Sequence, residues 1–236
     1  MINIEEQIQE LLQFQPGLQI KYSDDNQIAL TGIIKINAEY NKIQLVDEFL
    51  VEILVFKNFP DKIPVIYELG KRINKKLFQH VNPDNSLCLA VDTEIKLFIS
   101  VSKSLLAWFQ KYVVNYFYSV IFFERYNRYP FGERNHGVEG KKEFYRNYLK
   151  LKDISRILNV LFYLRKKNIK GHHSCPCGSG KRLRNCHERQ IKELLIIKDV
   201  DEIYIDILEL LPKKKAGIIM GYSVEKINSI LLGKEK

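Results

Sequence analysis

The chain has 236 residues, of which 46% are hydrophobic and 28% are charged. This composition excludes a disordered protein and suits one domain of about 150 residues with a second, smaller one. No apolar run approaches the roughly 18 to 20 residues of a membrane span, and the N-terminal MINIEEQIQELL is acidic and amphipathic, unlike a secretory signal. We therefore expect a cytoplasmic protein with reduced cysteines and no membrane association.

The net charge of +9 is concentrated late in the chain. Residues 1–150 carry 19 Lys and Arg against 18 Asp and Glu, whereas residues 151–236 carry 18 against 10. The excess is densest over 156–192, which holds ten basic residues and one acidic residue, Glu188. Such a block is usually a solvated face, but it also suits an acidic partner such as RNA, DNA or an acidic protein surface.

The first elements predicted along the chain are a helix and antiparallel strands. Apolar residues at helical spacing predict a helix over about 3–14, ended by the QPG that follows. Segments 28–38 and 43–56 are rich in Ile, Val, Leu and Phe and are separated by the turn-like EYNK, which predicts a hairpin. After the prolines of FPDKIP, the stretch VIYEL predicts a further short strand.

A coil region holding Cys88 comes next, followed by a long helix from Ser102, as the N-cap, to Arg125. The aromatic residues at helical spacing on this helix, including Trp108 and Tyr116, are typical of a core-facing stripe.

The rest of the chain predicts a loop around His136, helices over 141–150 and 154–167, and a polar, basic linker over 166–174. Two or three short helices would then end the chain. The expected domains are residues 1–150, a helix and linker over 151–171, and a small module over 172–236.

The segment CPCGSGKRLRNCH combines three thiols and one imidazole. Three thiolates and one imidazole form the closed, tetrahedral donor set that structural zinc takes, without an open position for catalysis. The glycines within the segment let the backbone curl so that ligands two residues apart can share one ion. The predicted zinc ligands are Cys175, Cys177, Cys186 and His187.

This segment closely resembles the SEC-C family, a small zinc-binding module with a Cys-Pro-Cys-Gly-Ser-Gly-Lys pattern. The same GSGK also suggests a phosphate loop, but no hydrophobic strand precedes it and Leu183 stands where Ser or Thr would hold magnesium. His172 and His173 are either alternative metal ligands or linker residues, and the linker interpretation is favoured.

Cys88 belongs to no cluster and follows the polar turn of HVNPDNSLCLA. A lone cysteine is commonly a small buried hydrophobe, but its position at the edge of a loop also suits a nucleophile. Asn82, six residues upstream, carries an amide that can stabilise an oxyanion forming on a carbonyl next to the sulfur. These residues are suited to acyl transfer.

The order of elements and motifs resembles the ubiquitin-conjugating (UBC-like) fold over about residues 1–150. A helix is followed by antiparallel strands, the two prolines of FPDKIP, the motifs His-x-Asn and Leu-Cys-Leu, and then a helix. The predicted fold is therefore α+β, a UBC-like domain followed by a small zinc module with short helices. The resemblance implies His80 as a structural histidine, Asn82 as an oxyanion or loop-stabilising residue and Cys88 as the thioester-forming thiol. Val81 replaces the family's usual proline, and Asn82 lies closer to the cysteine than in eukaryotic members, as in the bacterial branch.

Bacterial relatives of this kind occur in antiviral defence, in the cyclic-oligonucleotide-based signalling system (CBASS). The resemblance implies a cysteine acyltransferase whose Cys88 takes the C-terminus of a protein partner, such as a cyclic-nucleotide synthase, and passes it to an amine. The chain has no adenylating domain, so an activating enzyme is either a further partner or not required.

Two other interpretations stay open. The first is a non-catalytic UBC-like binding module or adaptor. The second is nucleic-acid binding by the basic C-terminal part, where 216–233 weakly resembles the second half of a helix-turn-helix, although an amphipathic helix on the zinc module explains the same residues better.

Overall fold

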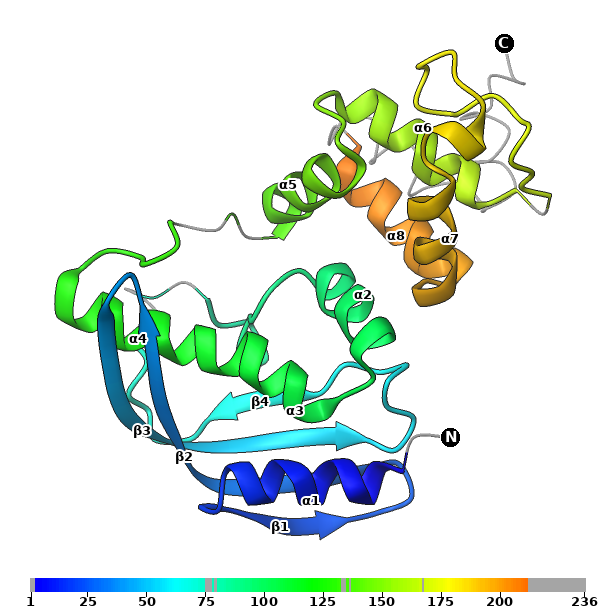
Figure 1. The fold of residues 1–236 in the computed structure, drawn as a ribbon. Coiled ribbons are helices and arrows are strands. Elements are labelled where there is room, and N and C mark those ends of the chain that lie inside the picture. The colour runs from blue at the N-terminus through cyan, green and yellow to red at the C-terminus, as the bar shows by residue number, and fades with distance from the viewer. Residues whose placement is uncertain are drawn as a thin grey trace. The chain divides into compact units, whose positions relative to one another are not determined.

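The computed structural model describes residues 3–74, 78, 80–132, 135, 137–166 and 168–211. The chain divides into two compact units, residues 1–136 and 137–236. The fold is mixed α+β: the first unit contains a four-stranded antiparallel sheet with helices, and helices build the described part of the second (Figure 1).

The sheet has the strand order β1-β2-β3-β4, so every strand pairs with its neighbour in sequence. Its strands are β1 (Leu18–Ser23), β2 (Gln27–Tyr40), β3 (Ile43–Phe56) and β4 (Val65–Glu68). The hairpin predicted over 28–56 and the strand predicted in VIYEL are both confirmed.

The β2–β3 hairpin is held in one register over its whole length, from Gln27 opposite Phe56 to Tyr40 opposite Ile43. Asn41 and Lys42 form its turn and both have positive φ, 48° and 64°. This is the backbone that a two-residue turn needs to match the twist of its strands. The inward side chains of both strands are aliphatic or aromatic and form the centre of the core.

Helices cover the hydrophobic residues of this sheet. They are α1 (Ile4–Phe14), α2 (Asp92–Ser102), α3 (Leu105–Trp108) and α4 (Val114–Tyr126), with a π-helical turn η1 (Phe109–Val113) between the last two. Helix α4 packs on β2 and β3, and α1 packs on α3. The aromatic stripe predicted to face the core is buried, with Trp108 0% and Tyr116 6% exposed.

The start of the long helix differs from the sequence prediction. Ser102 is the last residue of α2, and Ser104 is the N-cap, since its Oγ accepts a hydrogen bond of 3.0 Å from the Ala107 amide. The prediction was wrong because two serines in VSKS satisfy the same capping rule. Lys103 between them has φ 49°, a left-handed residue that ends α2.

Two elements were missed from the sequence. Strand β1 was overlooked although its residues, LQIKYS, alternate between apolar and polar, and in the structure only Leu18 of them is buried. Helix α2 begins at Asp92, and its N-cap, Val91, has no side chain that can cap it, so the helix lacks the usual N-terminal signal.

The second unit contains α5 (Gly137–Leu149), α6 (Ile154–Leu164), a short 3₁₀ turn η2 (Leu183–Asn185), α7 (Glu188–Ile197) and α8 (Val200–Leu210). Helix α5 packs on α6 and α8, and α6 also packs on α7. The sequence placed the first boundary at residue 150, whereas α5 shares its core with the helices that follow it.

This small core contains an ion cluster as well as apolar residues. The Asp206 carboxylate lies 2.9 Å from the Lys198 ammonium and 2.6 Å from the Lys141 ammonium, and it accepts a hydrogen bond from the Tyr145 hydroxyl. Burial alone would raise the pKa of Asp206, but these partners outweigh it and hold the pKa below its ordinary value.

The predicted linker over 166–174 lies within the second unit, between α6 and η2, and the partly buried Ile169 packs on its core. His136 and residues 216–233 lie outside the described residues. Every helix in the described part of the chain is too short or too polar to cross a bilayer.

Candidate active site and metal centre

The loop that carries Cys88 is fixed to the sheet by backbone hydrogen bonds. Leu87 donates to the Ile66 carbonyl of β4 at 2.8 Å, and Val81 and Leu87 form a bridge across the base of the loop. The Cys88 amide donates to the His80 carbonyl at 3.0 Å. The two ends of HVNPDNSLC are therefore held side by side, and the cysteine leaves the loop in a defined position.

Asn82 is bonded inside this loop. Its amide nitrogen donates to the Ser86 hydroxyl at 2.9 Å, and that hydroxyl donates to Asp84 at 2.7 Å. Backbone bonds between Asn82 and Ser86 and between Asn85 and Asn82 close the turn. The side chain thus braces the loop, and its amide carries a second N–H besides the one given to Ser86.

His80 contributes to the site through its carbonyl and its ring. The carbonyl accepts a second hydrogen bond, of 2.9 Å, from the Tyr116 hydroxyl on α4. The ring lies 5.0 Å from that of Phe78 and 5.3 Å from that of Tyr129, measured between centroids. This arrangement links the backbone of Cys88 to α4 through the His80 carbonyl.

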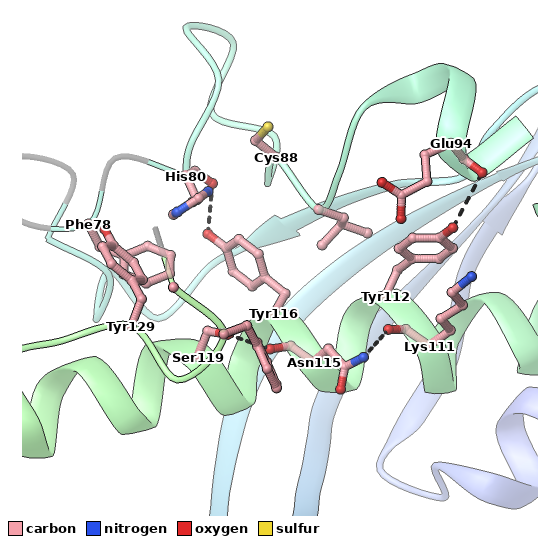
Figure 2. A pocket seen from close by; sticks show the side chains of 13 residues that line it. Phe78, His80, Cys88, Glu94, Lys111, Tyr112, Asn115, Tyr116, Ser119 and Tyr129 are labelled. Atoms are coloured by element: carbon pink, nitrogen blue, oxygen red, sulfur yellow. Dashed lines mark hydrogen bonds between the residues drawn. The ribbon is translucent and has the colours of Figure 1, made fainter. Parts of the chain in front are cut away.

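A cavity of about 180 Å³ lies between this loop and the long helix. Figure 2 shows Tyr116 rising from the helix toward the segment that holds His80 and Cys88, and Tyr112 rising toward Glu94 of α2. Most of the wall is aromatic or apolar, with several polar groups along the helix. The lining residues are Phe78, His80, Cys88, Leu89, Glu94, Lys111, Tyr112, Asn115, Tyr116, Ser119, Tyr129, Phe131 and Gly132.

Cys88 is neither fully exposed nor fully buried. Burial raises the pKa of its thiol above the ordinary cysteine value, and the negative charge of Asp92 at the start of α2 raises it further. The thiol is therefore mostly protonated at neutral pH, since both of these influences raise its pKa, whereas a neighbouring cation would lower it.

The second candidate site is the cysteine and histidine cluster. The four ligand atoms lie within 4.8 Å of one another. The sulfurs of Cys177 and Cys186 are 3.6 Å apart, and His187 Nδ1 is 3.3 Å from the sulfur of Cys175 and 3.1 Å from that of Cys186. Sulfur ligands about 2.3 Å from a tetrahedral ion are about 3.8 Å apart, so the donors fit a metal ion.

Neighbouring groups prepare these side chains for a metal. His187 Nε2 donates to the Leu149 carbonyl at the end of α5 at 2.8 Å, which leaves Nδ1 as the ligand atom. Burial opposes ionisation of Cys177, but hydrogen bonds from Ser179 and Cys175 lower the pKa of this thiol. Gly178 and Gly180 both have φ near +75°, the curled backbone expected of this segment.

The two linker histidines do not join the cluster. His173 Nδ1 is hydrogen-bonded to the Tyr163 hydroxyl at 2.8 Å, and its ring lies against that of His172, 4.9 Å away. Within the described residues, the cluster that could hold a metal consists of Cys175, Cys177, Cys186 and His187.

A family model described as the SEC-C motif matches residues 174–189, which include all four of these side chains. This match confirms the motif recognised from the sequence. No curated protein and no solved structure matches the chain.

Sequence reasoning missed the contribution of Tyr116 and the cavity itself. Tyr116 was assigned to the core on its helical spacing, and it is buried, but its hydroxyl also reaches the His80 carbonyl. A buried tyrosine usually bonds through its hydroxyl, and this was the available signal. The hydrogen-bond partner of Tyr116, the His80 carbonyl, lies on a loop distant in sequence, so residue spacing could not identify it.

Proposed function

We propose that the first unit is a ubiquitin-conjugating-like acyltransferase. Cys88 takes up the C-terminal acyl group of a protein partner as a thioester and passes it to an amine. The observation that carries this proposal is a partly exposed cysteine, held by backbone bonds to β4 and His80, on the wall of a cavity. The order of one helix, a four-stranded meander, the cysteine loop and further helices also supports a UBC-like fold.

The reaction has two steps. In the first, the Cys88 thiol gives its proton to solvent, the thiolate attacks the activated carbonyl, and a C–S bond forms as the activating group leaves. In the second, an amine attacks the thioester carbonyl, the C–S bond breaks, and the sulfur takes up a proton as the amide forms. A thiol with a raised pKa is a poorer leaving group, so its thioester resists hydrolysis until an amine is oriented beside it.

Three residues have proposed roles around the sulfur. The His80 carbonyl, bonded to both the Cys88 amide and Tyr116, positions the nucleophile. Asn82 braces the loop through Ser86, and its second amide N–H serves as an oxyanion donor. Asp92, whose negative charge acts on Cys88, accepts a proton from the incoming amine.

The partner suggested by the resemblance is a cyclic-nucleotide synthase of a bacterial antiviral system, joined through its C-terminus. Its acyl group must arrive activated, from an activating enzyme or an existing thioester, because attack on a free carboxylate by a thiol is unfavourable.

We further propose that the ion of the second unit is zinc, in a structural role. Three sulfurs and one imidazole nitrogen complete a tetrahedral shell and leave no position for a substrate. When bound, the ion cross-links the segment that holds the cysteines to the start of α7. The chain itself holds the site in place through the hydrogen bond from His187 to the Leu149 carbonyl, which links this centre to α5.

A second candidate function is a non-catalytic UBC-like adaptor. The raised pKa of Cys88 and the engagement of the Asn82 amide with Ser86 favour it, because neither makes the thiol more nucleophilic. In this alternative the basic second part of the chain would bind nucleic acid or an acidic partner.

Co-expression with the neighbouring operon proteins separates the two functions. The enzyme forms an adduct with its partner that intact mass detects and that thiols cleave. Cys88→Ala loses this adduct, whereas Cys88→Ser retains it as an ester that thiols do not cleave. An adaptor binds its partner equally well in all three proteins and forms no covalent product.

A further inference from the structure

We infer that the cavity beside Cys88 receives the chain end that the cysteine carries and selects one with an aromatic residue just before the terminal residue. This inference rests on the acyl-transfer function proposed above, and it adds the chemical class of the substrate.

The walls of the cavity match an aromatic ring. Three tyrosines, Tyr112, Tyr116 and Tyr129, and two phenylalanines, Phe78 and Phe131, contribute to the lining (Figure 2). The volume of about 180 Å³ exceeds the roughly 150 Å³ in which an apolar cavity binds benzene. Rings from several directions allow the edge-to-face contacts that aromatic side chains prefer.

The position of the cavity identifies which part of the substrate lies in it. Cys88 lines the cavity, and Figure 2 shows its sulfur on the side of the segment away from Tyr112 and Tyr116, so a chain joined to the sulfur enters over the rim. An extended chain advances about 3.3 to 3.6 Å per residue, so the residue before the terminal one lies within reach of the lining. The covalent bond holds that residue there for the lifetime of the thioester.

The charge of the wall does not favour the incoming amine as the occupant. Lys111 and Glu94 both line the cavity, so their charges offset each other. A wall with offset charges offers an incoming ammonium no net attraction to replace its hydration. A neutral, aromatic occupant needs no such attraction.

The π-helical turn gives a second reason to assign selectivity to this wall. It spans Phe109–Val113 and contributes two lining residues, Lys111 and Tyr112, while the Tyr112 hydroxyl reaches the Glu94 carbonyl at 3.4 Å. Such turns within α-helices are frequent at functional sites, because the extra residue redirects side chains.

The test uses the full-length protein and two sets of acetylated tetrapeptides, with Phe or Ala before a terminal glycine. In the first set the glycine is a thioester of mercaptoethanesulfonate. The Cys88 thiolate attacks its carbonyl, the new C–S bond forms, and the mercaptan leaves and takes a proton from water.

In the second set the glycine carries cysteamine as a mixed disulfide, which exchanges with Cys88 under excess mercaptoethanol. Intact mass counts the modified protein, and Cys88→Ala gives the background.

We expect the Phe peptides to modify Cys88 at least about ten-fold more efficiently than the Ala peptides in both sets, from burial of the ring. Ser119→Trp adds a ring to the half-buried helical wall and should abolish this preference. Arg125→Trp, an exposed position of the same helix outside the lining, should keep it.

Equal capture of Phe and Ala peptides by the disulfide set would overturn the selectivity. So would a preference that survives Ser119→Trp. If the disulfide set prefers Phe but no thioester modifies Cys88, the acyl-transfer function fails instead.

Discussion

The two units place their sulfur atoms in different surroundings. In the second unit three thiols converge with an imidazole, where burial raises the pKa of Cys175 and hydrogen bonds lower that of Cys177. In the first unit a single thiol stands on a cavity wall, and its pKa is raised by burial and by Asp92. The geometry of the cluster is compatible with a bound metal ion. Cys88 stands alone, and we propose that its sulfur forms a bond that later breaks again.

The same contrast extends to the two cores. The first unit has a large apolar and aromatic core on its sheet, and Cys88 is not among the residues of this core. The second unit is small, and its core includes two buried cysteines and the ion cluster at Asp206. We therefore expect substitutions of the polar groups described here to unfold the second unit but only to slow the reaction of the first.

The largest effect is expected from Cys177→Ser. Structural zinc contributes roughly 10 to 16 kcal/mol to the folding of small modules, more than a unit of this size can lose. The variant should bind no metal by native mass spectrometry, and its residues after 137 should be digested first in limited proteolysis. His172→Ala is the matched control, since this histidine lies outside the cluster. A Cys177→Ser protein with one bound ion and an intact second unit would refute the assignment.

A smaller loss is expected from Asp206→Asn, which removes the carboxylate beside Lys198 and leaves Lys141 with Glu209. Breaking such a buried pair costs about 3 to 5 kcal/mol. The pKa of Asp206 is lowered in the folded unit, so its contribution is present above the ordinary aspartate value and lost as pH falls through the lowered pKa. Thermal unfolding against pH measures this dependence, which the variant should lack.

The exposed Asp201, on the same helix, provides the control. Asp201→Asn should leave the acid dependence of unfolding unchanged. An Asp206→Asn protein as stable as the parent at pH 7 would mean that the ion cluster does not stabilise the unit.

In the first unit, Asn82→Ala should slow transfer from Cys88 by about 100-fold without loss of fold, the effect of removing one oxyanion donor. Ser86→Ala separates this role from bracing of the loop, because it removes the partner of the Asn82 amide and leaves the amide in place. Single-turnover rates should show less than about a ten-fold loss for Ser86→Ala. Equal losses in both variants would assign Asn82 to bracing alone.

The smallest effect is expected from Asp92→Asn. Removing this negative charge lowers the pKa of Cys88, and burial still holds it above the ordinary value. The thiolate fraction at pH 8 rises, so alkylation by iodoacetamide should be a few-fold faster. Asp61→Asn, at a distant exposed position, should not change the rate. A slower reaction in Asp92→Asn would show that the carboxylate activates the thiol.

The parts of this molecule that could be predicted from sequence are those fixed by local rules. Alternating apolar residues gave the β2–β3 hairpin, and close spacing gave the Cys175 to His187 cluster. Strand β1 carried a local signal, the alternation in LQIKYS, that was overlooked, whereas α2 has a valine at its N-cap and so lacks a capping signal. The cavity could not be predicted, because its wall combines residues distant in sequence: the loop at His80, the helix at Tyr116 and the segment at Tyr129.

The contrast between the two kinds of sulfur is tested most directly by site-resolved alkylation. The native, metal-loaded protein is treated with iodoacetamide between pH 6 and 11, and each cysteine is quantified by peptide mass spectrometry. We predict that Cys88 reacts in the folded protein with a midpoint above the ordinary cysteine pKa, and that Cys175, Cys177 and Cys186 react only after the metal is removed. If Cys88 were modified only as fast as the whole first unit unfolds, its sulfur would be closed to any substrate, and the acyl-transfer function would be contradicted.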